Sequence, residues 1–128
     1  MKKILASLLF IATIVSCKKE ETPVVEKTYS VEYKIELTPS PNTTLSGTAS
    51  YISKASATSS AVLASPGWTF TETNWALKKG DKVGFTATVA NVGAYKASIV
   101  IDGGVRALNN FSQSLPYNGT IQLSYTIE

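Results

Sequence analysis

The most regular feature of this sequence is the alternation of apolar and polar positions that begins after residue 28. From Tyr29 to Leu37 every second residue is apolar, and Glu32, Lys34 and Glu36 occupy positions between them. Successive side chains of a strand point to opposite faces, so this pattern predicts a half-buried β-strand with a charged outer face. Similar patterns predict further strands at 45–53, 61–64, 68–75, 82–89, 95–102, 105–110 and 120–127.

Turn residues separate the predicted strands. Proline-containing turns follow the first strand and precede Trp68, and Asp102-Gly103-Gly104 is a hairpin signal between two apolar runs. No helical period is present after residue 28. Seven or eight short strands with turns between them favour an all-β fold, an antiparallel β-sandwich of immunoglobulin-like kind. The Cys-Trp-Cys pattern of true immunoglobulin domains is absent, so the prediction concerns the architecture alone.

The segment from residue 68 to residue 75 does not fit one alternation. Trp68 and Phe70 share a face at period two, whereas Trp75 has the opposite parity. A bulge or turn near Thr73-Asn74 would return Trp75 to the core. Without such a bulge, Trp75 would be exposed. The sequence leaves both alternatives open.

The N-terminus has the pattern of a secretory signal peptide. Lys2 and Lys3 form a short basic region, and residues 4–15 are apolar apart from Ser7 and Thr13. A transmembrane helix needs about 20 apolar residues, and this run is far shorter. We therefore expect residues 1–16 to direct export and then to be removed.

The end of this signal carries the only cysteine of the chain. Ile14-Val15-Ser16-Cys17 resembles the lipobox of bacterial lipoproteins, in which two aliphatic residues and a small residue precede the lipidated cysteine. The resemblance implies cleavage before Cys17 and acylation of that cysteine, which would hold the protein on a membrane. The predicted organisation is a removed signal peptide at 1–16, a lipidated cysteine with a flexible tether at 17–28, and a β-sandwich domain at 29–128.

The tether contains a short charged motif. Lys19-Glu20-Glu21 resembles the export signal that follows the lipid cysteine in surface lipoproteins of Bacteroidota-type bacteria. That resemblance implies an outer-membrane lipoprotein exposed at the cell surface. The alternative interpretation is a solvated spacer whose charges carry no signal, in which case the orientation stays open.

Charge excludes one class of partner. The chain has 12 basic and 9 acidic residues, a net charge of +3, but two of the basic residues leave with the signal. The mature chain then keeps 112 residues, enough for one domain with a sizeable core, and a net charge of +1. No basic cluster remains that could follow a phosphate backbone, so we expect no nucleic-acid partner.

Catalytic chemistry is poorly represented. The chain has no histidine, which excludes Ser-His-Asp and Cys-His arrangements and any histidine-ligated metal, and Cys17 is committed to lipid. Glu32 and Glu36 lie on the charged face of an exposed strand, where paired carboxylates are ordinary. Asp81 and Asp102 lie beside glycines, where an aspartate is more often a turn residue than a calcium ligand. We therefore predict a protein that is not an enzyme and has no cofactor.

Three aromatic residues are the candidates for contact with a ligand or partner. Phe111 and Tyr117 fall in a predicted loop, and Trp75 has the broken parity described above. Binding residues concentrate in loops on rigid scaffolds, and exposed aromatic side chains are frequent anchors. We expect these three residues at one end of the sandwich.

Five pieces of the mature chain carry a family resemblance: Tyr29–Tyr33, Ala49–Ile52, Pro66–Phe70, Lys79–Val83 and Ser98–Gly103. In this order they resemble the MmpS family of small mycobacterial membrane proteins and their lipoprotein-like relatives. The resemblance implies an immunoglobulin-like sandwich outside the inner membrane and, in the mycobacterial members, an accessory role beside large RND-type exporters. This chain has an expected lipid anchor where those members have a transmembrane helix, and it lacks the cysteine pair of many of them.

Together these patterns predict an envelope-anchored, non-enzymatic binding or accessory module. Its expected partners are the membrane, through the acyl chains on Cys17, and either an envelope protein, such as a component of an export or transport complex, or a glycan. The alternative function is a surface-exposed carbohydrate-binding lipoprotein.

Overall fold

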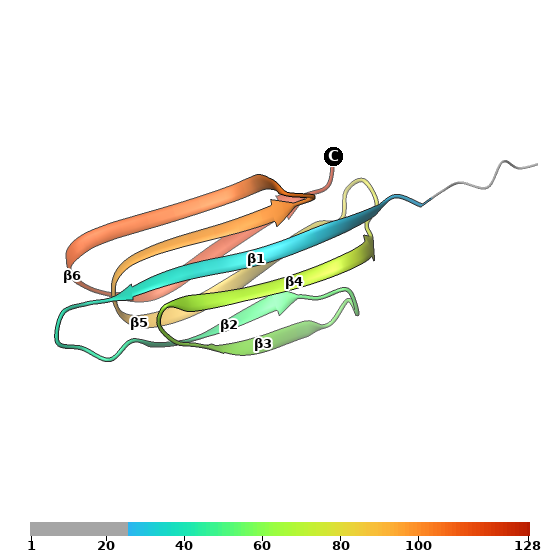
Figure 1. Ribbon diagram of the computed structural model, residues 1–128. Helices are drawn as coiled ribbons and strands as arrows, with labels where there is room; N and C mark the ends of the chain where they lie inside the picture. The colour runs from blue at the N-terminus through green and yellow to red at the C-terminus, as the bar shows by residue number, and fades with distance from the viewer. Residues whose placement is uncertain (1–25) are drawn as a thin grey trace, which may run out of the picture.

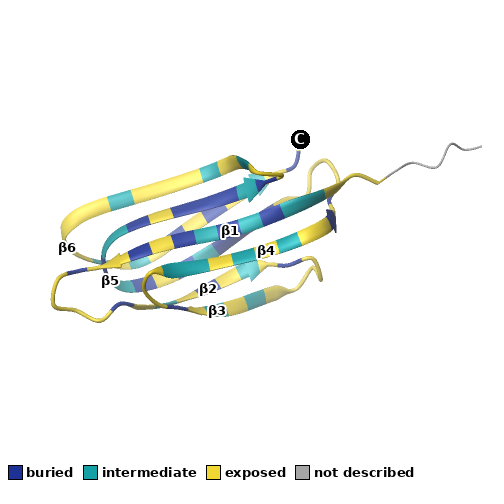
Figure 2. Cartoon of the chain, viewed as in Figure 1, coloured by how far each residue is buried: buried dark blue, intermediate teal, exposed yellow. Residues whose placement is uncertain are grey.

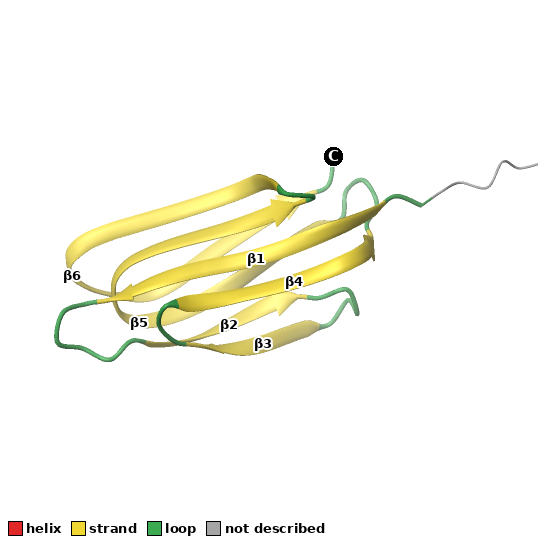
Figure 3. Ribbon diagram, in the orientation of Figure 1, coloured by secondary structure: helices red, strands yellow, loops and turns green. Residues whose placement is uncertain are grey.

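The computed structural model describes residues 26–128, and all regular structure in this range is β-strand (Figure 3). The predicted signal peptide and Cys17 lie outside the described residues. The strands are β1 (Thr28–Pro39), β2 (Ser46–Ile52), β3 (Thr58–Leu63), β4 (Gly67–Ala76), β5 (Lys82–Ile101) and β6 (Gly104–Thr126).

The strands form one antiparallel sheet organised around β5. The order is β3-β2-β5-β1-β4, and β6 pairs with the other side of β5 (Figure 1). The first half of β5 pairs with β2 through Phe85–Ala90, and the second half pairs with β1 through Val92–Ile101. The predicted all-β, antiparallel fold is therefore confirmed.

The number of strands differs from the prediction of seven or eight. The described residues form six, because the segments predicted at 82–89 and 95–102 are the two halves of β5, and those at 105–110 and 120–127 both lie in β6. The register shifts between Val89 and Val92, where Asn91 has a φ of 62°. A bulge bends a strand without ending its pairing, so the turn expected at this point is a bend within a continuous strand.

The sheet curls, so that its apolar rows meet in one core (Figure 2). The Tyr33 hydroxyl of β1 donates a hydrogen bond to the Ile52 carbonyl (2.9 Å) and accepts one from the Gly84 N–H (3.2 Å). The Tyr33 ring also packs on Phe85 at 5.7 Å between centroids. These contacts join β1 to the half of the sheet that contains β2. The largest fully buried side chains are Tyr33, Ile35, Leu63, Ile99, Ile121, Val31, Val83 and Val92.

The curled sheet has two ends, which we call the near end and the far end (Figure 1). β1 begins at the near end, and β1 from Tyr29 to Leu37 spans roughly 26 Å at the rise of a strand. The near end contains the start of β1 and the segments 53–57, 77–81, 102–103 and 127–128. The far end contains the segments 40–45, 64–66, 90–94 and 111–119.

Candidate functional site

Trp75 lies in the core at the near end, with 6% of its surface exposed. Tyr29 pairs with Trp75 and Val31 pairs with Glu72, so one residue of β1 faces two residues of β4. Asn74, one of those two, has a φ of 53°. The bulge that the sequence left as one of two alternatives is therefore present, and it returns Trp75 to the inward face.

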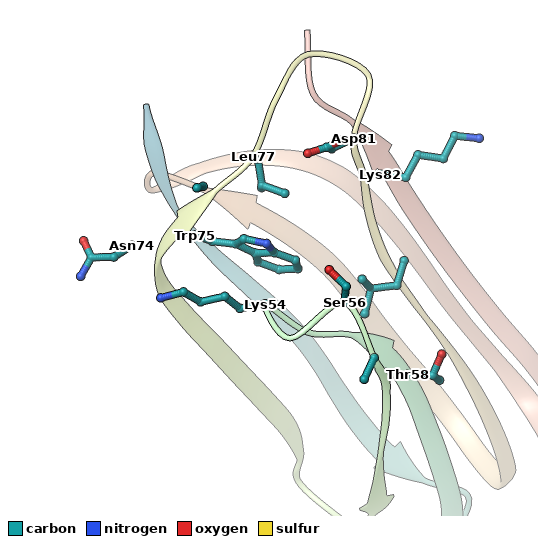
Figure 4. A pocket seen from close by; sticks show the side chains of 11 residues that line it. Lys54, Ser56, Thr58, Asn74, Trp75, Leu77, Asp81 and Lys82 are labelled. Carbon is teal, nitrogen blue, oxygen red and sulfur yellow. The ribbon is translucent and has the colours of Figure 1, made fainter. Parts of the chain in front are cut away.

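A pocket of about 670 Å³ opens beside Trp75 (Figure 4). This volume falls within the range of small-ligand sites. The indole lies across the pocket between Leu77 and the turn that carries Ser56. The lining comes from the 53–57 and 77–81 turns and the strand ends beside them, in β2, β3, β4 and β5. Its residues are Ile52, Lys54, Ser56, Ala57, Thr58, Asn74, Trp75, Ala76, Leu77, Asp81 and Lys82.

The charged groups around the pocket are mostly cations. The Lys54 Nζ donates a hydrogen bond to the Thr73 carbonyl (3.3 Å). The Asp81 Oδ2 accepts one from the Lys78 N–H (2.9 Å), and the Asp81 N–H donates to the Lys78 carbonyl (3.0 Å). This carboxylate therefore closes its own turn. Lys79 and Lys82 add two more ammonium groups to the same segment.

The charged groups of the lining are Lys54, Asp81 and Lys82. Asp81 is the one carboxylate in the lining, and it already caps a turn. No group of three or more His, Cys, Asp or Glu able to hold a metal is present within residues 26–128. A lysine-rich rim over an apolar floor attracts an anion and covers its apolar part.

The other carboxylates considered from the sequence also have structural roles. The Asp102 Oδ1 accepts a hydrogen bond from the Ser30 N–H (2.9 Å), which fixes the β5–β6 turn against β1. Glu36 forms an ion pair with Lys34 (2.7 Å) on the outer face of the sheet. The hydrogen bond and charge of Lys34 lower the pKa of Glu36, and those of Glu36 raise the pKa of Lys34.

Phe111 and Tyr117 lie at the far end, packed on Tyr95. The ring centroids are 5.5 Å apart for Tyr95 and Phe111, 5.7 Å for Tyr95 and Tyr117, and 4.9 Å for Phe111 and Tyr117. Tyr95 is buried and the other two are half-buried, and this burial raises the pKa of the Tyr95 phenol. The rings therefore cover the far end of the core and present only part of their surface to solvent.

The expectation that all three aromatic residues share one end is corrected by the strand register. Trp75 pairs with Tyr29, whereas Phe111 pairs with Tyr95, which lies opposite Leu37. The structure thus brings Phe111 and Tyr117 together and places Trp75 at the other end, roughly 26 Å away along β1.

Next to the far-end aromatic residues, four residues of β6 protrude as a bulge. Ser112 pairs with Ala94 and Tyr117 pairs with Val92, so residues 113–116 face Gly93 alone. Leu115 lies in this bulge with 73% of its surface exposed. Leu115 is not among the residues that the sequence pattern singles out, although an aliphatic residue between Ser114 and Pro116 in a turn-rich segment indicates exposure.

A hydrogen-bond network holds the far end together. The Asn91 N–H donates to the Asn118 Oδ1 (2.9 Å), and the Asn91 Nδ2 donates to the Thr44 carbonyl (2.9 Å). The Ser40 N–H donates to the Asn91 carbonyl (2.9 Å). Hydrogen bonds therefore join the bend of β5 both to β6 and to the β1–β2 connection. These bonds fix the position of the chain on which the bulge lies.

The two ends also differ in charge. The far-end segments 40–45, 64–66, 90–94 and 111–119 contain no Asp, Glu, Lys or Arg. The near end contains a lysine in its 53–57 turn and a lysine-rich 77–81 turn that continues into Lys82. The molecule thus has one charged, hollowed end and one uncharged end with an exposed leucine.

Comparison with known proteins gives no assignment: no family model and no curated protein matches the chain. Residues 26–128 contain no helix long and apolar enough to cross a membrane. The two ends of the sheet are therefore the features from which function is inferred.

Proposed function

We propose that this protein is a lipid-anchored, non-enzymatic binding module of the bacterial envelope, held on the outer membrane by acyl chains on Cys17. Its far end contacts another envelope protein, in the manner of an accessory subunit of an export or transport complex. The fold proposed to carry this surface is an immunoglobulin-like sandwich. The two halves of β5 support that proposal, since each lies between β6 and a different neighbour, β2 or β1.

The observation that carries this proposal is the exposure of Leu115. It lies on a bulge of β6 at the far end, which is uncharged and held together by hydrogen bonds. A protruding aliphatic side chain is stabilised when it leaves water for a partner's pocket, whereas it offers a sugar no hydrogen bond. Phe111 and Tyr117 already stack on Tyr95, so their ring faces are largely occupied. A protein partner therefore fits this end better than the alternative, a glycan.

The direction of the chain supports the same conclusion. Cys17 precedes β1 by 11 residues, a tether that reaches roughly 35 Å when extended, and β1 begins at the near end. A lipid on Cys17 therefore tethers the near end, and not the far end, within roughly 35 Å of the membrane. The far end is at the opposite end of β1 from this tether, where a partner can reach it.

The anchor is tested by the change Cys17→Ala in the full-length protein. We expect unprocessed or soluble material, because stable anchoring requires acyl chains at this position. Membrane fractionation and the mass of the mature N-terminus are the measurements. Normal processing and continued membrane fractionation of Cys17→Ala would refute the anchor.

The contact surface is tested by a photo-crosslinking amino acid placed at position 115 or, as a matched control, at position 62. Val62 is 81% exposed on β3, an edge strand that β2 and β5 separate from β6 in the sheet. We expect a discrete protein adduct from position 115 in native membranes and none from position 62.

A second change tests whether the bulge must be uncharged. Asn118→Asp keeps an oxygen that can accept the Asn91 N–H, but it places a negative charge beside the bulge. We therefore expect this variant to lose the adduct from position 115 while the fold is kept. Equal labelling from positions 115 and 62, or binding to immobilised glycan that Leu115→Asp abolishes, would contradict a protein partner.

A further inference from the structure

We propose that the near-end pocket binds anionic, phosphate-bearing headgroups of the membrane in which the protein is anchored, so that the domain adopts one orientation on the bilayer. This inference rests on the proposed lipidation of Cys17. It adds a second membrane contact, made by the folded domain itself, to the one made by the acyl chains.

The first argument is the charge around the pocket. Lys54 lines one side, and Lys78, Lys79 and Lys82 belong to the segment that forms the other side. Asp81 is the acidic residue among them, and its carboxylate accepts the Lys78 N–H. Each lysine near an anionic surface strengthens membrane partition by about fivefold.

Acidic groups are also present at this end, but outside the lining. Glu128 follows Ile127, whose N–H donates to the Asp81 carbonyl (2.9 Å), Glu26 precedes β1, and Asp102 lies in the β5–β6 turn. None of the three lines the pocket. The pocket rim therefore keeps an excess of positive charge even though the whole near end is mixed.

The second argument is the shape of the site. Trp75 and Leu77, both largely buried, form the base of the pocket; the Lys54 side chain lies beside the indole and the Lys82 side chain extends outward on the other side (Figure 4). The exposed Ile52 adds apolar surface to the lining. An ammonium group has three hydrogen-bond donors, and the Lys54 Nζ donates one of them to the Thr73 carbonyl, which leaves two for a phosphate. The arrangement suits a phosphate at the rim with the start of a lipid's apolar part against Ile52, which is the exposed apolar side chain of the lining.

The third argument is the position of the pocket relative to the anchor. Thr28 pairs with Ala76, so the chain that arrives from Cys17 enters the sheet beside the pocket. A tether of 11 residues holds this end within roughly 35 Å of the lipid. At that range the lysines experience the surface potential of the bilayer once the domain tilts toward it, since the potential decays within about 10 Å at moderate salt.

The test uses the mature lipidated protein in vesicles of phosphatidylcholine with or without phosphatidylglycerol. The single native cysteine is occupied by lipid, so a cysteine introduced at Ala55 or at Gln113 is the only free thiol and carries a nitroxide. Ala55 is exposed in the 53–57 turn and Gln113 is exposed at the far end. Collision of the nitroxide with a nickel-chelating lipid headgroup is measured by electron paramagnetic resonance.

We expect anionic lipid to raise the collision rate of the Ala55 label at least threefold and to leave that of the Gln113 label unchanged. Reversing the two lysines that line the pocket (K54E, K82E) should abolish the increase. The matched control makes the same change in net charge at two lysines outside the pocket, K34E and K96E, and should keep it. High salt should weaken the increase in the native protein.

The outcomes separate the two proposals. Protein that does not float with neutral vesicles lacks the anchor, and the proposed function then fails. Protein that floats equally with both vesicles, and whose Ala55 label does not respond to anionic lipid, keeps the anchor but refutes headgroup binding. An equal loss of the increase in the K34E/K96E control would also refute the pocket, because the effect would then follow net charge alone.

Discussion

At the scale of single residues, Tyr33 shows how a buried polar group can join two parts of a sheet. Its side chain is fully buried, and its hydroxyl satisfies one carbonyl and one N–H that belong to β2 and β5. Leaving such backbone groups without a partner costs more than the hydrogen bond contributes when formed. The same burial raises the pKa of Tyr33 from 10.0 to about 12, mainly because the interior disfavours the phenolate.

Tyr33→Phe should therefore lower the free energy of unfolding by about 1–3 kcal/mol. Since the folded state favours the neutral phenol, the contribution of Tyr33 is complete below pH 10 and is lost as the pH rises from 10.0 through about 12. Urea unfolding between pH 8 and 12 measures both effects. Tyr125→Phe, at a half-buried position, serves as the control, and an equal loss in both variants would contradict the bridging role.

Trp75 is the second residue whose environment has a measurable consequence. Because it is 6% exposed in the core, Trp75→Ala should cost about 3–5 kcal/mol. The control Val62→Ala, at a position 81% exposed, should stay within about 0.5 kcal/mol. Thermal melts of the two variants decide the point: a Trp75→Ala protein as stable as the control would place the indole outside the core.

At the scale of elements, the alternation in the sequence identified the faces of the strands but not their ends. In β1 and β5 the inward rows are those expected, because burial of every second residue is a local property of an extended chain. The alternation does not predict that β5 continues as one strand through Asn91. A residue with positive φ is typical both of a turn and of a bulge, and the choice depends on whether a neighbouring strand continues the pairing.

The register of β5 predicts opposite outcomes for two nearby residues. Ile99 is fully buried and Lys96 is exposed. Ile99→Ala should cost about 2–5 kcal/mol, as large-to-small core changes do, whereas Lys96→Ala should stay within about 0.5 kcal/mol. Chemical denaturation measures the difference. Similar losses in the free energy of unfolding for both variants would mean that the register of β5 is wrong by one residue.

At the scale of the whole molecule, one core must supply the stability of the domain. The single cysteine allows no disulfide within the chain, and the absence of histidine leaves few metal ligands. The inward rows of all six strands therefore have to supply the stabilising energy by apolar burial.

The melting temperature should accordingly be unchanged by a chelator or a thiol reductant. Calorimetry of the lipidated protein in detergent, with and without each reagent, provides the measurement. A fall of several degrees on adding the chelator would reveal a structural metal. A fall with the reductant alone would mean that Cys17 carries no lipid and forms a disulfide between two chains.

The site was harder to predict than the fold, because its residues are brought together by pairing between strands that are distant in the sequence. Phe111 and Tyr117 were recognised as neighbours because they are close in sequence. The separation of Trp75 from them depends on strand pairing across the whole sheet, which no local pattern encodes. The near-end pocket was missed for the same reason, since its two lysine-bearing sides are more than 20 residues apart in the chain.

The far-end bulge has a consequence for how this protein can change over evolutionary time. Residues 113–116 lie between two pairs, Ala94 with Ser112 and Val92 with Tyr117, and each pair is fixed independently of the length of chain between them. Residues can therefore be inserted or deleted here while both halves of β6 keep their alignment with β5. Homologues of this protein could then acquire new partners through length variation at one position of a long strand, with the rest of the sheet unaltered.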